Sequence, residues 1–234
     1  MQTNRIVLVF DLDETLYDER MFTHSGLRAV ARYWSESYGM SYRHFLKALI
    51  RLRASGSRHV FDEALREVGK YSRGAVKRCL SIYYGHTPRI KLDADARRCL
   101  IRMRRFAKYI VTDGNQNIQK NKIVALGIEP FMKRCFITHR FGIDRSKPSP
   151  YCFQRICRLE RVGPEKVVYI GDNPHKDFVG IKPLGFKTIR VLKGQHRHVC
   201  LSDRYEAQWQ INSLDQLEGN LLSRVFRGTV CAED

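Results

Sequence analysis

The chain has 234 residues, and 43% of them are hydrophobic, which suits one large domain or a core domain with a smaller insertion and argues against disorder. No stretch approaches the about 20 consecutive apolar residues that a membrane-spanning helix needs, so we exclude a transmembrane protein. The formal net charge is +18, which is compatible with nucleic acid, an anionic surface or small anionic substrates as partners.

The N-terminal segment carries one short apolar run, residues 6–10, which Asp11 and Asp13 follow at once. A signal peptide needs an apolar stretch of about 7–15 residues and a small-residue cleavage site. Neither is present, so we expect a cytoplasmic protein.

Cysteine and histidine spacing argues against disulfides and against a zinc site. The seven cysteines show no Cys-x-x-Cys spacing, and we expect most of them to be small buried hydrophobic residues. His196 and His198 have only Cys200 beside them, too few ligands for zinc. We interpret this segment as a solvated loop.

Five short apolar runs predict the strands of a parallel sheet, because continuous runs suit strands that are buried on both faces. They are residues 6–10, 109–112, 135–138, 167–170 and 188–192. Helical patterns separate the last four runs: one covers 117–126 and ends at Gly127, and one covers 151–159 with Ser149 as N-cap and Pro150 as first helical residue. The alternation predicts a doubly wound α/β sheet.

Residues 18–92 contain no predicted strand. Apolar residues recur there at helical spacing, which predicts helices over 27–38, 42–50, 59–68 and 74–84. We interpret 18–92 as an all-helical domain inserted into a core made of 1–17 and 93–222. The chain returns to the core through a helix over 94–106, and residues 223–234 stay an unassigned tail.

The first strand ends in Asp11, Asp13 and Thr15. Ligands bind at the carboxyl ends of strands in open α/β sheets, and two carboxylates there repel each other unless a cation compensates. Mg²⁺ prefers such oxygen ligands. The alternative is a helix start with acidic residues in its first turn.

Weaker motifs follow the second and third strands. Thr112 and Asp113 begin a loop that leads into a helix, where a hydroxyl and free N–H groups form an anion site. Lys147 precedes Pro148 and is able to neutralise a phosphate oxygen. An ordinary capped loop and a surface lysine are the alternatives.

The fourth strand ends in a more specific pattern, which comprises Gly171, Asp172, Asn173 and Asp177. Gly171 allows close approach of backbone and ligand, Asp172 is able to reach a metal, and Asp177 is able to orient a lysine or a metal-bound water. A polar turn is the alternative.

Together these motifs resemble the four signatures of the haloacid dehalogenase superfamily: Asp-x-Asp-x-Thr, a Thr or Ser, a Lys, and Gly-Asp-x-x-x-x-Asp. The resemblance covers about residues 5–217, and the helical insertion looks like the C1-type cap of the subfamily I phosphatases. Asp113 stands where many members carry Asn, which puts only a neighbouring contact in doubt.

The resemblance implies a Mg²⁺-dependent phosphatase. Asp11 would attack phosphorus to form an aspartyl-phosphate, and Asp13 would protonate the leaving alcohol and then activate water. Dehalogenases of the superfamily lack this second acid, so Asp13 points to phosphoryl chemistry.

The resemblance also implies the binding residues. Mg²⁺ would be held by Asp11, the backbone carbonyl of Asp13, and Asp172. Thr112, Asp113 and Lys147 would bind the phosphoryl group. The supporting residues would be Thr15, Gly171, Asn173 and Asp177.

Two rival functions stay open. A phosphomutase carries the same motifs, and a nucleic-acid-binding protein would fit the basic run from Arg97 to Lys108. We prefer a solvated helix face for that run, and we expect a small phosphorylated metabolite as partner, either a sugar phosphate or a nucleoside monophosphate. Neither the substrate nor the oligomeric state is readable from the sequence.

Overall fold

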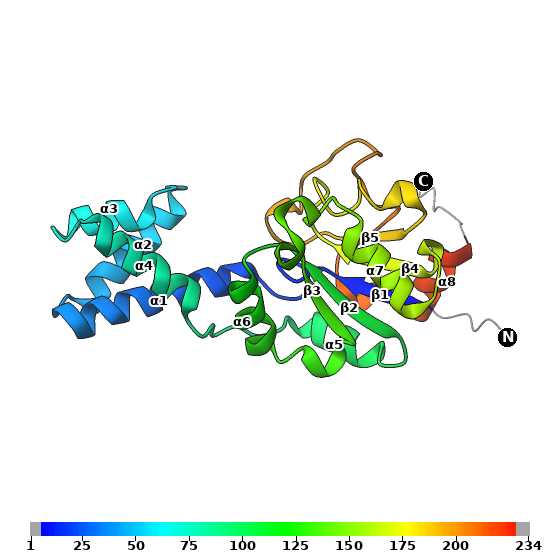
Figure 1. Cartoon of the computed structure of the whole chain (residues 1–234), viewed down its shortest axis with the longest axis horizontal. Helices are drawn as coiled ribbons and strands as arrows, with labels where there is room; N and C mark the ends of the chain where they lie inside the picture. The colour runs from blue at the N-terminus through cyan, green and yellow to red at the C-terminus, as the bar shows by residue number, and fades with distance from the viewer. Residues whose placement is uncertain (1–5, 228–234) are drawn as a thin grey trace. The chain divides into compact units, whose positions relative to one another are not determined.

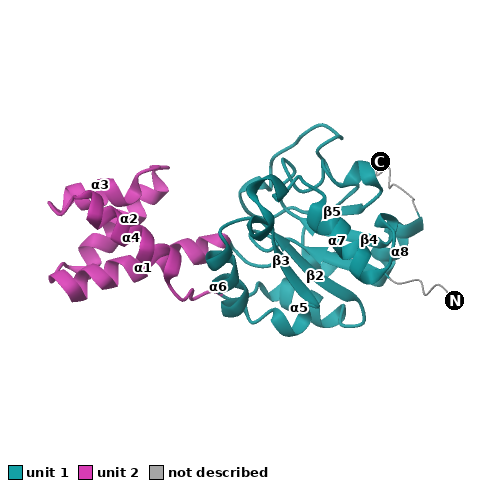
Figure 2. Cartoon of the chain, viewed as in Figure 1, with its two compact units in different colours: residues 1–18, 91–234 teal, residues 19–90 magenta. Residues whose placement is uncertain are grey.

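The structure is a computed structural model, and it describes residues 6–227. The chain forms two compact units, coloured separately in Figure 2. One unit holds the chain up to Asp18 and from Lys91 onward, and the other holds Glu19–Ile90. Among the described residues, no helix is both long enough and apolar enough to cross a membrane.

A six-stranded parallel sheet forms the centre of the first unit (Figure 1). Its strand order is β3-β2-β1-β4-β5-β6, and every neighbouring pair is parallel. The strands are β1 (Val7–Phe10), β2 (Ala107–Thr112), β3 (Arg134–Ile137), β4 (Val167–Gly171), β5 (Lys187–Val191) and β6 (Trp209–Ile211). The predicted fold class and the five predicted strands are confirmed. The sequence analysis missed β6, because three residues are too few to show a period.

The strand order reverses between β1 and β4. The chain adds β2 and β3 on one side of β1 and then returns to add β4, β5 and β6 on the other. Residues of β1 alternate between the two faces of the sheet, and all four of them are fully buried. Val7 and Val9 pack in one cluster with Phe153 and Ile156 of the helix α7 (Tyr151–Glu160). A doubly wound sheet opens a crevice for ligands at such a reversal.

Four longer helices belong to the sheet unit: α5 (Ala94–Arg102), α6 (Gln116–Leu126), α7 (Tyr151–Glu160) and α8 (Gly219–Arg227). Turns of 3-10 helix connect the elements at Glu129–Phe131, Thr138–Phe141, Ile143–Arg145, Pro164–Lys166, Lys182–Leu184, Gly194–His196 and Leu214–Gln216. Gly127 ends α6 in the left-handed conformation, with φ of 60°, as its position predicts.

Two helix predictions and the tail assignment differ from the structure. Pro150, not Ser149, is the N-cap of α7, and the Ser149 hydroxyl accepts only a long bond of 3.5 Å from the amide of Tyr151. The helix expected over 94–106 stops at Arg102, since residues 103–106 form a turn into β2. Helix α8 continues past residue 222 to Arg227 and buries Val225 completely, so these residues belong to the folded unit. The rest of the expected tail, with Cys231, lies outside the described residues.

The second unit consists of four helices: α1 (Glu19–Tyr38), α2 (Tyr42–Ala54), α3 (Val60–Glu67) and α4 (Arg73–Gly85). Ser41 and Ser72 cap α2 and α4 through their side chains, which satisfies free amides at the helix starts. The apolar faces of all four helices share one core. In this core the indole of Trp34 donates to the Cys79 sulfur at 3.1 Å. The expected helical spacing is confirmed, except that Tyr38 is exposed and stacks on Trp34.

One buried carboxylate joins three separate segments of the sheet unit. Asp95, in the first turn of α5, accepts bonds from Lys193 Nζ (2.8 Å), from Ser213 Oγ (2.8 Å) and from the amide of Leu214 (3.0 Å). Burial alone would raise the pKa of Asp95, but these donors lower it below its ordinary value. The charged form of Asp95 therefore stabilises the fold.

We predict that Asp95→Ala lowers the free energy of unfolding by about 2 kcal/mol at neutral pH, since it leaves buried donors unpaired. Because the folded-state pKa is depressed, this contribution is complete above the unfolded pKa of about 4 and is lost as the pH falls through the lower folded value. Urea denaturation at pH 7 and near pH 3 measures both effects. The control is Asp93→Ala, whose side chain bonds only Lys193 among the described contacts. An equal loss in both variants would contradict the assignment.

Candidate active site

The carboxyl end of β1 meets the carboxyl end of β4 around a buried lysine. Lys147 Nζ lies 2.8 Å from Asp11 Oδ1, 2.8 Å from Asp177 Oδ1 and 2.9 Å from the Tyr169 hydroxyl. Its side chain is only 1% exposed. Asp11 is fixed in turn because its amide donates to the carbonyl of Ile170 in β4. The structure thus brings together the motifs of the first, third and fourth strands.

Three buried carboxylates converge beside that lysine. One oxygen each from Asp11, Asp172 and Asp177 lies within 4.8 Å of the others. Asp177 Oδ2 also accepts from the amide of Asn173 at 2.9 Å. Gly171 lets the Asp177 carboxylate approach the backbone, because a Cβ there would lie 2.4 Å from Asp177 Oδ2 and displace it.

Burial raises the proton affinity of Asp11 and Asp172. Desolvation, together with repulsion from Asp177, raises the pKa of Asp11 to about 7 even though Lys147 opposes the shift. Desolvation and the charges of Asp11 and Asp177 raise the pKa of Asp172 to about 9. Lys147 is also desolvated, but its carboxylate neighbours raise its pKa well above the ordinary value. One ammonium therefore faces three carboxyl groups.

The donor set fits a hard divalent cation. Carboxylate oxygens are the ligands that Mg²⁺ and Ca²⁺ prefer, and a bound cation would offset the desolvation and the repulsion that raise the pKa values of Asp11 and Asp172. Asp177 joins the expected ligands Asp11 and Asp172 in this group of side chains. The expected ligand at position 13 is a backbone carbonyl, and it stays a prediction.

Asp13 is held by a separate set of donors. Its Oδ1 accepts from Tyr17 (2.5 Å) and from Lys122 (2.6 Å), and its Oδ2 accepts from Gln119 (2.8 Å). The sequence analysis did not assign Gln119 or Lys122 to the site. One signal was present: Lys122 stands among apolar residues of the predicted helix over 117–126, where a lysine needs a buried partner.

The end of β2 and the loop after it form hydrogen bonds with several segments around the site. The Thr112 hydroxyl accepts from Gln119 at 2.6 Å. Asp113, expected to bind phosphate, accepts from Thr138 (2.8 Å), from the amide of Lys147 (3.0 Å) and from Lys176 Nζ (3.0 Å). Burial disfavours its charge, yet Lys147 and Lys176 hold its pKa below the ordinary value. Its observed contacts thus join three loops.

The remaining supporting residues occupy turns around the site. Asn173 Oδ1 accepts from the amide of His175, so its side chain caps the loop after β4. Thr15 is fully buried, and within residues 6–227 no hydrogen-bond partner reaches its hydroxyl. His196, expected in a solvated loop, lies against the ring of His175 with centroids 5.8 Å apart. Burial lowers the pKa of His196, which is half-buried, whereas His198 and Cys200 are exposed as expected for a solvated loop.

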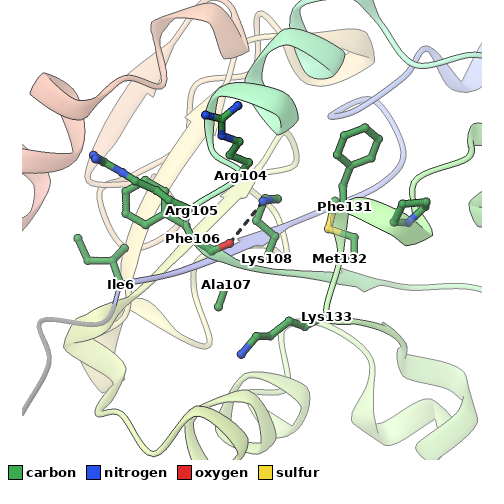
Figure 3. Close-up of a pocket in the computed structure, with 10 residues that line it drawn as sticks. Ile6, Arg104, Arg105, Phe106, Ala107, Lys108, Phe131, Met132 and Lys133 are labelled. Atoms are coloured by element: carbon green, nitrogen blue, oxygen red, sulfur yellow. Dashed lines mark hydrogen bonds between the residues drawn. The ribbon is translucent and has the colours of Figure 1, made fainter.

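The basic run is not simply a solvated helix face. Arg98 pairs with Asp215, and Arg102 donates to backbone carbonyls of the segment 214–217. Lys108 is buried in β2, and its Nζ donates to the carbonyl of Met103 at 2.9 Å. It also donates to the carbonyl of Phe106 at 3.4 Å, the bond drawn in Figure 3. It lines a hollow of about 550 Å³ together with residues at the start of β2, whereas the carboxylates lie at the other end of the strands.

Residues 7–185 match the haloacid dehalogenase-like hydrolase family. The chain belongs to that family. The predicted resemblance is therefore confirmed, whereas the C1-type assignment of the helical unit stays a prediction.

Relatives named as phosphatases match most of the chain. It is 27% identical to a glyceraldehyde 3-phosphate phosphatase from Methanocaldococcus jannaschii, over 90% of this chain and 94% of the relative. It is 30% identical to a phosphoserine phosphatase from Thermus thermophilus, over 73% of this chain and 66% of the relative.

Solved structures share the fold. A 2-haloacid dehalogenase from Pseudomonas syringae has a TM-score of 0.64 at 20% identity, over 94% of this chain and 99% of that one. A putative hydrolase of the family from Bacillus subtilis was solved with bound magnesium. It has a TM-score of 0.62 at 20% identity, over 95% of this chain and 98% of that one.

We predict that the protein in chelator loses stability as the pH rises from about 5 to 8. Folded Asp11 and Asp172 retain protons that the unfolded chain releases near pH 4, so each retained proton contributes a slope approaching about 1.4 kcal/mol per pH unit. Urea denaturation at several pH values measures the slope.

Two further measurements assign this slope to the cluster. Asp172→Asn should make it shallower, and Mg²⁺ at pH 8 should restore the stability of the wild type. The same slope in the wild type and in Asp172→Asn would contradict the charge assignment.

Proposed function

We propose that this protein is a Mg²⁺-dependent phosphatase that hydrolyses a small phosphomonoester through an aspartyl-phosphate. The observation that carries the proposal is the convergence of Asp11, Asp172 and Asp177 around one buried ammonium, at the ligand-binding edge of a parallel sheet. The phosphatases among the relatives support the same reaction class.

Asp11 would be the nucleophile. One carboxylate oxygen would attack phosphorus while the bond from phosphorus to the leaving oxygen breaks. Lys147, 2.8 Å from Asp11 Oδ1, would orient the attacking carboxylate and offset the charge that gathers on the phosphoryl oxygens. The Thr112 hydroxyl would donate to another of these oxygens.

Asp13 would act as acid and then as base. In the first step it would give a proton to the leaving alkoxide, and in the second it would take a proton from the water that attacks the aspartyl-phosphate. This cycle returns Asp11 and Asp13 to their starting forms and releases an alcohol and phosphate. Asp13 is half-buried, whereas Asp11 is buried, which suits a group that must meet water.

Asp11, Asp172 and Asp177 would hold Mg²⁺, directly or through water. The bound ion would supply a positive charge for the phosphoryl oxygens. The buried oxygen-only donor set supports Mg²⁺ over zinc, which takes nitrogen and sulfur ligands more readily.

The substrate is proposed to be a small sugar phosphate or a similar metabolite. Glyceraldehyde 3-phosphate and phosphoserine, named for the relatives, are both phosphomonoesters of three-carbon alcohols. We further propose that the helical unit of Glu19–Ile90 acts as a C1-type cap and selects the substrate. Its place in the chain, directly after the first carboxylate motif, supports this role.

We predict that Asp11→Asn lowers phosphate release by at least about a thousandfold, because an amide is a poor nucleophile. The assay measures phosphate from a panel that includes glyceraldehyde 3-phosphate, phosphoserine, sugar phosphates and nucleoside monophosphates, with Mg²⁺ and with EDTA. Asp144→Asn is the matched control, since this exposed side chain pairs only with Arg145 among the described ion pairs.

The wild type and the control should share one Mg²⁺-dependent activity. A folded Asp11→Asn protein that keeps near wild-type turnover would contradict the proposal. Conversion of a substrate into an isomer without release of phosphate would instead identify a phosphomutase.

A further inference from the structure

Two buried side chains of α6 point at the acid-base carboxylate from one side. Gln119 and Lys122 stand three residues apart, so they share a face of the helix. Their side chains reach different oxygens of Asp13: Gln119 Nε2 lies 2.8 Å from Oδ2 and Lys122 Nζ lies 2.6 Å from Oδ1. Both oxygens are therefore fixed by one helix.

The amide of Gln119 also determines the direction of the Thr112 hydroxyl. Its nitrogen must face Asp13, because a carboxylate is only an acceptor when ionised. The second hydrogen of that nitrogen goes to Thr112 Oγ1 at 2.6 Å. Since the oxygen of Thr112 accepts this bond, its own proton is left to be donated elsewhere.

A glycine in the loop after β2 leaves room for the side chain of Gln119. Gly114 has a φ of +130°, a conformation that suits glycine. A Cβ at this position would lie 3.3 Å from Gln119 Cγ. The loop thus lies close over the side chain and leaves Gln119 only 2% exposed.

Lys122 is not explained by stability. Its side chain is 3% exposed in its pair with Asp13, and removing an ammonium from water costs about as much as such a pair returns. An apolar residue of similar length would suit the face of α6 that buries Ile123 and Leu126. A function for the ammonium accounts for its presence.

We propose that Lys122 and Gln119 are positioning residues for the phosphatase reaction: Lys122 fixes the carboxylate of Asp13, and Gln119 couples Asp13 to Thr112 so that the Thr112 hydroxyl donates to the phosphoryl group. This inference rests on the proposed function, because it assigns both residues to the acid-base step and to the binding of the phosphoryl group.

The test of Lys122 compares Lys122→Met with Lys120→Met, an exposed lysine on the same helix. Lys122→Met should lower kcat by about tenfold to a hundredfold, the cost of a misplaced catalytic group, and change KM by less than about threefold. The loss should be larger for an alkyl phosphate than for p-nitrophenyl phosphate, whose leaving group needs little proton transfer. Lys122→Arg should recover part of the rate, and Lys120→Met should match the wild type.

A double-mutant cycle separates action through Asp13 from a general defect. In an Asp13→Asn background, Lys122→Met should cause no further loss, because the group it positions is already gone. Independent, multiplicative losses would overturn the role of Lys122 while leaving the phosphatase proposal intact. Full activity of Asp13→Asn, or no phosphate release by the wild type, would overturn both. If Lys122→Met does not fold, Lys122→Gln is measured in the same cycle.

The role of Gln119 is tested separately, through KM and through inhibition by inorganic phosphate. Gln119→Leu should raise KM and weaken competitive inhibition by inorganic phosphate severalfold, because the Thr112 hydroxyl loses its fixed direction. Lys122→Met should leave that inhibition unchanged. Wild-type inhibition in a folded Gln119→Leu protein would overturn the coupling to Thr112.

Discussion

The architecture of the site depends on one buried ammonium that lies between two carboxylates. Lys147 contacts Asp11 from the end of β1 and Asp177 from the loop after β4, and the side chains of all three residues are less than a tenth exposed. Such a group is unstable in isolation, because each charge loses its hydration. It is held because neighbouring strands of a rigid parallel sheet deliver the charges to one edge.

The same constraint leaves the site short of positive charge. With Asp172 included, three carboxyl groups face one ammonium, and desolvation together with repulsion between the carboxylates raises the pKa values of Asp11 and Asp172. A phosphoryl group brings still more negative charge. A divalent cation resolves both problems at once, which is why the geometry supports Mg²⁺ more strongly than any single motif does.

Much of this organisation is predictable from the sequence, and the reason is physical. Continuous apolar runs identify buried parallel strands, and polar residues that follow such runs must share one sheet edge, which placed Asp11, Lys147 and Asp172 together. The sequence does not show the directions in which the side chains point. Spacing alone does not show that Asp13 turns away from the other carboxylates toward Lys122, or that Asp113 joins three loops. The sequence analysis did not predict the strand β6 for a simpler reason, since three residues are too few to show a hydrophobic period.

The central claim is that Asp11 carries the phosphoryl group during turnover, and chemical trapping tests it most directly. Asp13→Asn protein would be mixed with p-nitrophenyl phosphate and Mg²⁺, quenched in acid, reduced with borohydride and digested for mass spectrometry. Reduction converts an aspartyl-phosphate into homoserine. The account predicts homoserine at position 11 alone, and none in a sample without substrate. Homoserine at another aspartate, or p-nitrophenol release with position 11 unmodified, would contradict it.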